Sequence, residues 1–389
     1  MHGWYHEEQF CFSGSCNWKV LWEYIDRNGL GGVLGSVVID ELCEVPEDIV
    51  QLSTHRYFSN QMHFEQALNC CRELAQAASK LKIPVRVLKG PALALQGYVD
   101  TGTRSFSDID VFVDSAESVQ RLRVALAGSG YSSPDSQNII EKLGESETAK
   151  FFLNNWELEF RYPLEPPGEP MFEILSHHSS VLLRVPQESD DVLRPDPSLH
   201  LVFLIQHMAV HHLFSRFFWF LDLAVLIRNC REQIDFILVE EELKRLGLIN
   251  VAAVAADFCR KYIDPDFPRL GHSVLAWNNR IMVCFADPVN IARGRFGIYH
   301  KKYSHKFLGY LVGVVSFYLI ADPDKKRFFG FATNWTLNRF RNSFGFDKPI
   351  VWVDFLLKPV IALLLVPLAW GTALCLTKKD HEKMSLSSE

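Results

Sequence analysis

Residues 83–113, IPVRVLKGPALALQGYVDTGTRSFSDIDVFV, decide how the rest of the chain is interpreted. Two runs rich in valine and isoleucine, at 83–88 and 109–113, predict short buried strands. Between them the tripeptide KGP at 89–91 precedes an apolar stretch at 92–98 that is long enough for a helix. The order strand, helix, loop, strand therefore predicts that a sheet packed against helices lies at the centre of the fold.

Two aspartates, Asp108 and Asp110, begin the second strand. Side chains in a strand alternate between its faces, so these two carboxylates share one face, about 7 Å apart along the strand. Two such carboxylates form a site for hard divalent cations. Most Asp-x-Asp pairs are only the solvated face of an edge strand. Here a Gly-Pro helix start and an arginine-bearing loop precede the pair, and Glu-x-Glu follows at 157–159, so a functional pair is favoured.

Composition narrows the class of protein. Of the 389 residues, 48% are hydrophobic and 22% are charged, which is typical of a globular chain. The net charge of −6 argues against general nucleic-acid binding, which needs a basic face. The nine cysteines are irregularly spaced and mostly lie in apolar stretches, so we expect reduced thiols in a cytoplasmic protein. The first ten residues contain no apolar signal core, so secretion is not expected.

The whole chain indicates an α+β fold in which a mixed sheet flanked by helices is followed by an all-helical lobe. Asn154 and Asn155 separate two alternating segments and predict a hairpin. Asp196 and Pro197 predict the capped start of a long helix. The expected regions are an N-terminal helical segment at 1–80, a catalytic core at 81–185, the helical lobe at 186–300 and an apolar and basic C-terminal region at 301–389.

The C-terminal region could contact a membrane. Residues 359–376 are eighteen residues without a charge, which is the lower limit for a membrane span. Basic and aromatic residues alternate at 325–346, a pattern typical of docking on anionic lipid but also of a helical flap over the catalytic core. Spanning, lying on the membrane and burial in the protein all remain open for 359–376. We favour peripheral contact through 307–376, at the inner face of the membrane.

The central stretch also offers groups for a nucleotide. Gly90 lets the backbone approach a ligand at the start of a helix, where free N–H groups favour phosphate. Lys89, Arg104 and Ser107 are candidates for contacts with the phosphates or the leaving group. Asp108 and Asp110 are the expected ligands of two Mg²⁺ ions, or of Mn²⁺, bridging a triphosphate.

A third carboxylate from a neighbouring strand would complete this site. Glu157 is the first candidate and Glu159 the second. Further along the chain, His207, His211 and Asp222 are candidates for lining a cleft that binds the acceptor or the base. The four-residue spacing of the two histidines also suits zinc, but no cysteine or acid lies near them in the sequence, so the cleft is favoured.

The motifs LKGPALALQGY at 88–98 and RSFSDIDVFV at 104–113 resemble the uncharacterised nucleotidyltransferase family of the DNA polymerase beta superfamily. The resemblance continues in WELEF at 156–160 and in the helical lobe, and it covers about residues 17–285. It implies a nucleotidyltransferase-type sheet, metal-binding Asp108 and Asp110, and Glu157 as the third acid. Two departures stand out: Gly90 is followed by proline where the superfamily has serine or glycine, and Glu159 stands where a histidine is expected.

These observations predict an enzyme that moves a nucleotidyl group from an NTP to a hydroxyl of a small molecule, sugar, lipid or protein. Asp108, Asp110 and Glu157 are the expected catalytic residues. The main alternative keeps the fold without turnover, as a nucleotide-binding or scaffold protein at a membrane surface. A metal-dependent phosphohydrolase is less favoured, because its histidine and acid spacing is absent.

Overall fold

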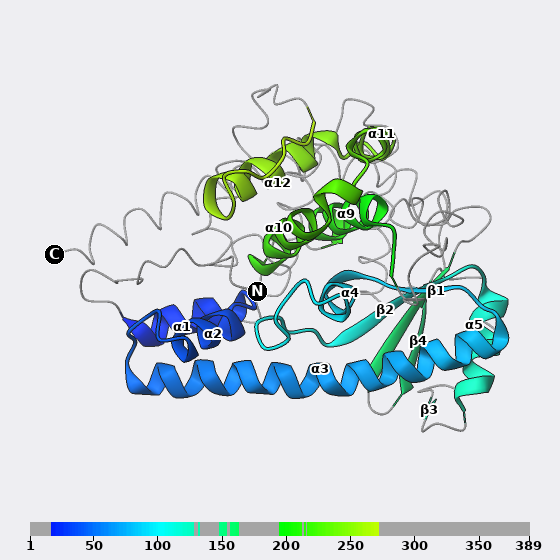
Figure 1. Cartoon of the computed structure of the whole chain (residues 1–389), viewed down its shortest axis with the longest axis horizontal. Coiled ribbons are helices and arrows are strands. Elements are labelled where there is room, and N and C mark those ends of the chain that lie inside the picture. Colours follow the sequence, from blue (N-terminus) through cyan, green and yellow to red (C-terminus); the bar gives the residue numbers. More distant parts are fainter. Residues whose placement is uncertain are drawn as a thin grey trace, which may run out of the picture.

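The computed structural model describes residues 17–127, 131–132, 148–153, 156–162, 194–211, 214 and 216–271. It is built around a mixed five-stranded sheet with the strand order β1-β2-β5-β4-β3. The pair β2–β5 is parallel, and the other three neighbouring pairs are antiparallel. The strands are β1 (Val85–Val87), β2 (Asp108–Val113), β3 (Tyr131–Ser132), β4 (Thr148–Leu153) and β5 (Trp156–Arg161). Together with the helices on either side, this sheet confirms the expected α+β class (Figure 1).

Within the described residues 17–84, three helices precede the sheet. They are α1 (Trp18–Arg27), α2 (Gly31–Ile39) and α3 (Glu47–Leu81). The longest of them, α3, runs for 35 residues. It ends at Lys82, which adopts the left-handed conformation. The second half of α3 lies in the same hydrophobic core as the sheet.

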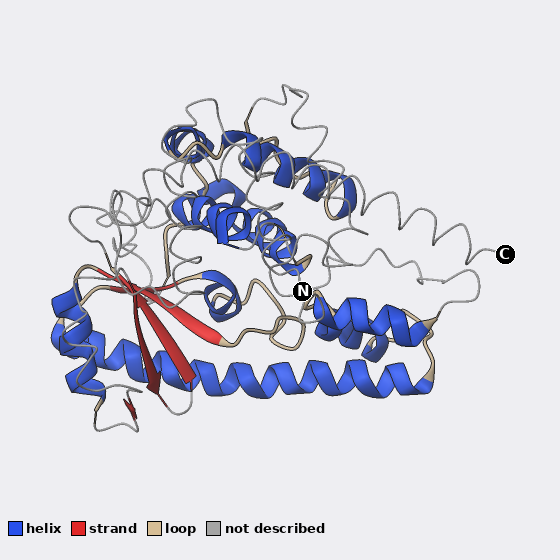
Figure 2. Ribbon diagram, turned by 180° about the vertical axis from the view of Figure 1, so that it is seen from behind, coloured by secondary structure: helices blue, strands red, loops and turns tan. Residues whose placement is uncertain are grey.

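Alternation along β2 divides the hydrophobic core in two. Ile109, Val111 and Val113 pack with α3 and with α5 (Ala116–Leu126) on one face of the sheet. Phe112 points to the other face and belongs to the core that is formed with the helical lobe. Figure 2 shows the strands between α3 on one side and the lobe helices on the other. Since Asp108 and Asp110 share the face of Phe112, they are directed to the lobe side of the sheet.

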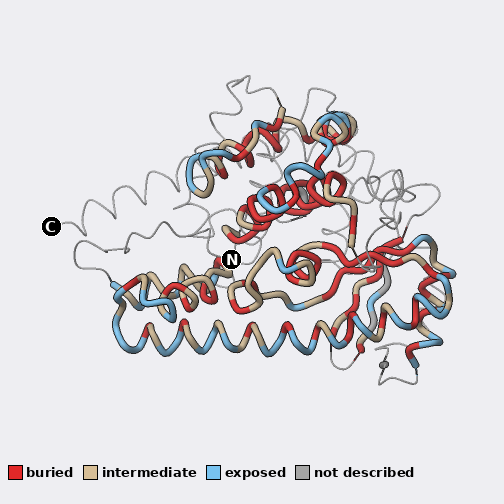
Figure 3. Tube along the Cα trace, in the orientation of Figure 1, coloured by how far each residue is buried: buried red, intermediate tan, exposed pale blue. Residues whose placement is uncertain are grey.

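The lobe consists of α9 (Pro197–Gln206), a π-helical turn η1 (His207–His211), α10 (Phe218–Cys230), a 3₁₀ turn η2 (Arg231–Gln233), α11 (Phe236–Arg245) and α12 (Ile249–Tyr262). The predicted cap of α9 is confirmed: Asp196 Oδ1 accepts the N–H of Ser198 at 2.9 Å and of Leu199 at 3.1 Å. Figure 3 shows that α9 and α10 are almost wholly buried, whereas α3 exposes its outer side. Phe220 and Phe258, whose ring centroids are 4.0 Å apart, stack α10 on α12.

Local boundaries differ from the sequence predictions by a few residues. The strand expected at 83–88 is reduced to β1, and the helix expected at 92–98 is α4 (Lys89–Leu95), which begins and ends three residues early. The helix after β2 is capped by Ser115, whose Oγ accepts the N–H of Ser118. No helix among the described residues is long and apolar enough to cross a membrane. The predictions for 301–389, including membrane contact through 307–376, fall outside the described residues.

A loop between α4 and β2 is fastened to the N-terminal helices. The side-chain amide of Asn60 donates to the carbonyl oxygen of Gly102 at 2.9 Å, and Tyr57 Oη donates to Asp100 Oδ2 at 2.9 Å. Gly32 in α2 packs against the same carbonyl group, where a Cβ would lie 2.1 Å from the oxygen. These contacts fix the backbone immediately before Arg104.

We expect Gly32→Ala to lower the free energy of unfolding by about 2 kcal/mol or more, because the added methyl group meets backbone that cannot move aside. Gly97→Ala is the control, since a Cβ there meets nothing within 4 Å and only the positive φ of 68° is unfavourable, which costs about 1–2 kcal/mol. Urea unfolding of both variants measures the difference. A Gly32→Ala protein as stable as the wild type would contradict the close approach of α2 to the loop.

Candidate active site

The register of two parallel strands brings four acids to one face of the sheet. Asp108 pairs with Glu157 and Asp110 pairs with Glu159 across β2 and β5. One carboxylate oxygen from each of Asp108, Asp110 and Glu159 lies within 4.8 Å of the other two. We call these three residues the acid cluster. No other group of three or more metal-ligating side chains is found in the described part of the chain.

Glu157 is not part of the acid cluster. Its Oε1 lies 2.6 Å from Nζ of Lys150, a residue of β4 whose side chain is 57% exposed. The structure therefore brings Glu159, which the sequence ranked second, to the two aspartates, and it joins Glu157 to a surface lysine. The alternation of β5 places both glutamates on the same face, and Lys150 of β4 contacts both, because its Nζ also lies 3.9 Å from Glu159 Oε1.

Two cations hold the carboxylate of Asp110, which is only 1% exposed. Lys89 Nζ lies 2.8 Å from Asp110 Oδ1, and Arg161 donates from Nε to the same oxygen at 2.9 Å. Burial by itself would raise the pKa of Asp110, but Lys89 and Arg161 outweigh it and hold that pKa below its usual value. Arg161 also donates from Nη2 to Glu159 Oε2 at 2.9 Å.

The pKa of Glu159 is shifted in the opposite direction to that of Asp110. Burial raises its pKa, and although Arg161 opposes this effect, the negative charge of Asp110 adds to it. A carboxylate with a raised pKa and a carboxylate with a lowered pKa thus lie side by side. Such a division is typical of sites where one acid binds a cation and the other accepts a proton.

Lys89 is held in an unusual backbone conformation at the start of α4. Its φ is +58°, which is uncommon for a residue with a side chain. Its backbone N–H donates to Nε2 of His200 in α9 at 3.1 Å, so the first turn of α4 is joined directly to the lobe. His200 is 1% exposed, and burial lowers its pKa from 6.5 to about 3, which keeps the ring neutral and able to accept.

Arg104 and Asp222 form a second connection between the sheet and the lobe. The guanidinium donates to both carboxylate oxygens from Nε and Nη2, each at 2.9 Å, and it stacks over the Phe218 ring at 4.0 Å. Gly90 packs against the same guanidinium, where a Cβ would lie 2.7 Å from Nη2. Two residues that the sequence assigned separately, to a nucleotide and to an acceptor cleft, therefore bind each other.

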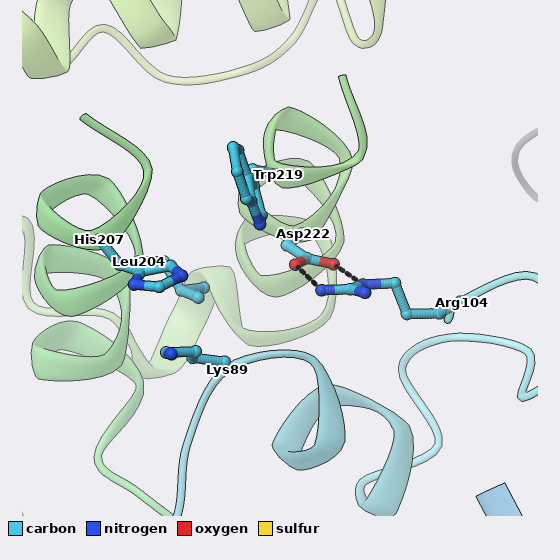
Figure 4. Close-up of a pocket in the computed structure, with 6 residues that line it drawn as sticks. All are labelled: Lys89, Arg104, Leu204, His207, Trp219 and Asp222. Atoms are coloured by element: carbon cyan, nitrogen blue, oxygen red, sulfur yellow. Dashed lines mark hydrogen bonds and ion pairs between the residues drawn. The ribbon is translucent and has the colours of Figure 1, made fainter. Parts of the chain in front are cut away.

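A small pocket with an empty volume of about 240 Å³ lies beside this pair. Figure 4 shows the residues that line it, which come from α4, from the loop before β2 and from the lobe: Lys89, Arg104, Leu204, His207, Trp219 and Asp222. The His207 ring is parallel to Phe203 and meets Trp219 edge-on. Because Lys89 lines the pocket and also contacts Asp110, the pocket and the acid cluster adjoin.

The remaining candidates are placed as follows. Ser107 is exposed, and its Oγ lies 3.3 Å from Asp108 Oδ1, at the edge of the acid cluster. His211 belongs to the backbone of η1, but its side chain lies outside the described residues. The contacts of His200 and His207 do not support a zinc site at the histidines. His200 accepts a backbone N–H, and His207 packs against two aromatic rings.

The chemistry of the acid cluster suits a divalent cation. Three carboxylate oxygens within 4.8 Å of one another are hard donors, the type preferred by Mg²⁺ and Mn²⁺. The ion pairs that Lys89 and Arg161 form with Asp110 were not predicted from the sequence. Arg161 could have been found from the alternation of Glu157, Glu159 and Arg161 along one strand, whereas no local pattern indicates the contact of His200 with Lys89.

We expect Asp222→Asn to lower the free energy of unfolding by about 3 kcal/mol, because it leaves the buried Arg104 guanidinium without its countercharge. The double variant Arg104→Met/Asp222→Leu should lose less than the sum of the single changes. Asp26→Asn is the matched control, since Asp26 pairs with Arg56 at 2.8 Å on the surface, where a pair contributes about 0.5 kcal/mol. Urea unfolding measures these variants together with the single changes Arg104→Met and Asp222→Leu; equal losses in Asp26→Asn and Asp222→Asn would disprove a buried pair.

The neutral state of His200 predicts a pH dependence of stability. The folded pKa of about 3 lies below the unfolded value of 6.5, so the unfolded chain binds a proton that the folded chain does not, and stability falls as the pH falls below 6.5. Between pH 7 and pH 5 the expected loss is about 2 kcal/mol.

His200→Gln should remove this loss while keeping an acceptor for Lys89. Urea unfolding at the two pH values checks it, with His55→Gln on the exposed side of α3 as a control that should follow the wild type. Identical losses in the wild type and in His200→Gln would show that His200 is not the responsible group.

Comparison with known proteins adds one match. Neither the curated proteins nor the solved structures contain a match to this chain. The model of one protein family, described as an uncharacterised nucleotidyltransferase, matches residues 14–264. This range includes the acid cluster, the pocket and the described helices of the lobe up to α12. The chain belongs to the uncharacterised nucleotidyltransferase family.

Proposed function

We propose that this chain transfers a nucleotidyl group from an NTP to a hydroxyl group of an acceptor, with a divalent cation as cofactor. The observation that carries the proposal is the acid cluster: Asp108, Asp110 and Glu159 converge within 4.8 Å on the sheet face directed to the lobe. Membership of a nucleotidyltransferase family supports the same reaction class. A mixed sheet with an Asp-x-Asp strand parallel to the strand of the third acid also supports placing the family in the DNA polymerase beta superfamily.

Each residue of the site has a role in this reaction. Asp108 and Asp110 hold the cation, which neutralises the triphosphate and steadies the leaving pyrophosphate when bound. The acceptor oxygen attacks the α-phosphorus, and the bond from that phosphorus to the β-phosphate oxygen breaks. Glu159 accepts the proton of the hydroxyl, because its raised pKa makes it the more basic acid of the cluster. Lys89 lies between Asp110 and the pocket, where its ammonium can contact a phosphate.

The pocket provides the site for a small part of the acceptor or of the base. His207 and Trp219 offer aromatic surface at its lobe side, and Lys89 forms its border with the acid cluster. Arg104 and Asp222 fix the wall of the pocket through their mutual ion pair rather than through two ligand contacts.

A protein that binds nucleotide without turnover is the second candidate. It is favoured by the ion pairs of Lys89 and Arg161 with Asp110, which already neutralise the carboxylate that should bind the cation. It is also favoured by Pro91, which supplies no hydroxyl for a phosphate at the start of α4. Tight NTP binding with no release of pyrophosphate, even with cell extract as the source of acceptors, would distinguish it from the enzyme.

A transfer screen with α-³²P-labelled NTPs, Mg²⁺ or Mn²⁺ and fractionated cell extract tests the enzyme directly. We expect Asp110→Asn and Glu159→Gln to lower labelling by about 10²-fold or more, because they remove a cation ligand and the proton acceptor. Glu157→Gln is the matched control and should stay within a few-fold of the wild type, since Glu157 contacts Lys150. Equal labelling by the wild type and Asp110→Asn would rule the reaction out. If labelling is lost in Glu157→Gln but not in Glu159→Gln, Glu157 is the residue that accepts the proton.

A further inference from the structure

The guanidinium of Arg161 lies inside the acid cluster. It donates from Nε to Asp110 and from Nη2 to Glu159, each at 2.9 Å. It thereby links carboxylates from two strands, β2 and β5, which is the position of a bridging cation in a site with several carboxylates. Its side chain is 5% exposed and extends from the same strand as Glu159, so little space is available for it to turn elsewhere.

Lys89 supplies a second positive charge to the same oxygen. Its Nζ lies 2.8 Å from Asp110 Oδ1, and its side chain is 13% exposed. The backbone N–H bond to His200 fixes the residue that carries this ammonium. Asp110 therefore has two cationic partners, whereas the described contacts of Asp108 are with the hydroxyl of Ser107.

The charges of these two residues equal the charge of one divalent cation. Two Mg²⁺ ions bring four positive charges to a triphosphate and three carboxylates. One Mg²⁺ ion together with Lys89 and Arg161 also brings four. Lys89 and Arg161 both contact Oδ1 of Asp110, so one ion can be held by Asp108 and by Oδ2 of Asp110. A second ion would have to approach Oδ1, where two cations already lie within 3 Å, at a cost that is large in a buried site.

We propose that the acid cluster takes one divalent cation with the bound nucleotide, and that Lys89 and Arg161 supply the charge of the second. This proposal rests on the proposed nucleotidyl transfer and narrows it to a reaction with one ion per site. Asp108 and Asp110 hold that ion, and Arg161 keeps Asp110 and Glu159 together in place of the other.

Counting bound Mn²⁺ tests the proposal without any assay of activity. The full chain, in excess over α,β-methylene ATP and then over the corresponding GTP, CTP and UTP analogues, is dialysed against Mn²⁺, and the ions bound per analogue are counted. Electron paramagnetic resonance gives a second measure, because two Mn²⁺ ions about 3.5–4 Å apart, as in two-metal sites, are magnetically coupled. We expect one ion per bound analogue and no coupling.

The possible counts separate this proposal from the proposed function. Two coupled ions in the wild type would overturn the one-ion site and leave nucleotidyl transfer standing. If the protein adds no ion to the number bound by each free analogue, and binds none of the four analogues more tightly with Mn²⁺ than without it, both proposals fail.

Substitutions test whether the two side chains exclude the second ion. We expect Arg161→Met and Lys89→Met to raise the count from one to two, and Arg161→Lys to keep it at one. Lys244→Met is the control, because Lys244 contacts Glu240 within α11 and no residue of the acid cluster, and its count should stay at one. Circular dichroism checks that each variant folds. Because the Lys89 side chain is less buried than that of Arg161, the ion count of Lys89→Met is the deciding result if Arg161→Met does not fold. If every folded variant still binds one Mn²⁺ ion per analogue, the proposal that Lys89 and Arg161 take the place of a second ion is overturned.

Discussion

The buried carboxylate of Asp110 is the point on which the rest of the site depends. An ionised carboxylate that is 1% exposed is strongly unfavourable unless it is paired and hydrogen-bonded. Asp110 obtains its partners from two different elements, Lys89 at the start of α4 and Arg161 at the end of β5. Removal of either partner would leave a charge uncompensated in the sheet. The pairing therefore determines how α4, β2 and β5 meet, in addition to what the site can bind.

Two long-range polar contacts connect the segments around Asp110 to the lobe. Lys89 donates its backbone N–H to His200 in α9, and Arg104 binds Asp222 in α10 with two hydrogen bonds. Both contacts start from segments that border the acid cluster, and both end on helices whose side chains line the pocket. The lobe is thus joined to the chemistry of the sheet by polar contacts as well as by the shared core around Phe112. A change in the lobe would be transmitted first to Lys89 and Arg104.

Local signals in the sequence predicted the parts of this structure that depend on neighbouring residues. The cap at Asp196 was found because a capping side chain bonds to N–H groups two or three residues away. Alternation placed Asp108 and Asp110 on one face. Alternation could not decide between Glu157 and Glu159, because both lie on the same face of β5 as the two aspartates. The pairing of Arg104 with Asp222 joins residues 118 positions apart, and no local pattern carries that information.

The order of residues in Lys89-Gly90-Pro91 follows from three separate constraints. Position 89 has a positive φ, which glycine would adopt more easily, but only a cationic side chain there can reach Asp110. Position 90 has no room for a Cβ beside the Arg104 guanidinium, so the glycine is required by space and not by a turn. Position 91 lies in the first turn of α4, where a residue without an N–H leaves no donor unpaired. Exchanging lysine and glycine would therefore lose the ion pair at one position and create a clash at the next, although the backbone strain would be relieved. The strained lysine is retained because its charge is needed at that point of the sheet.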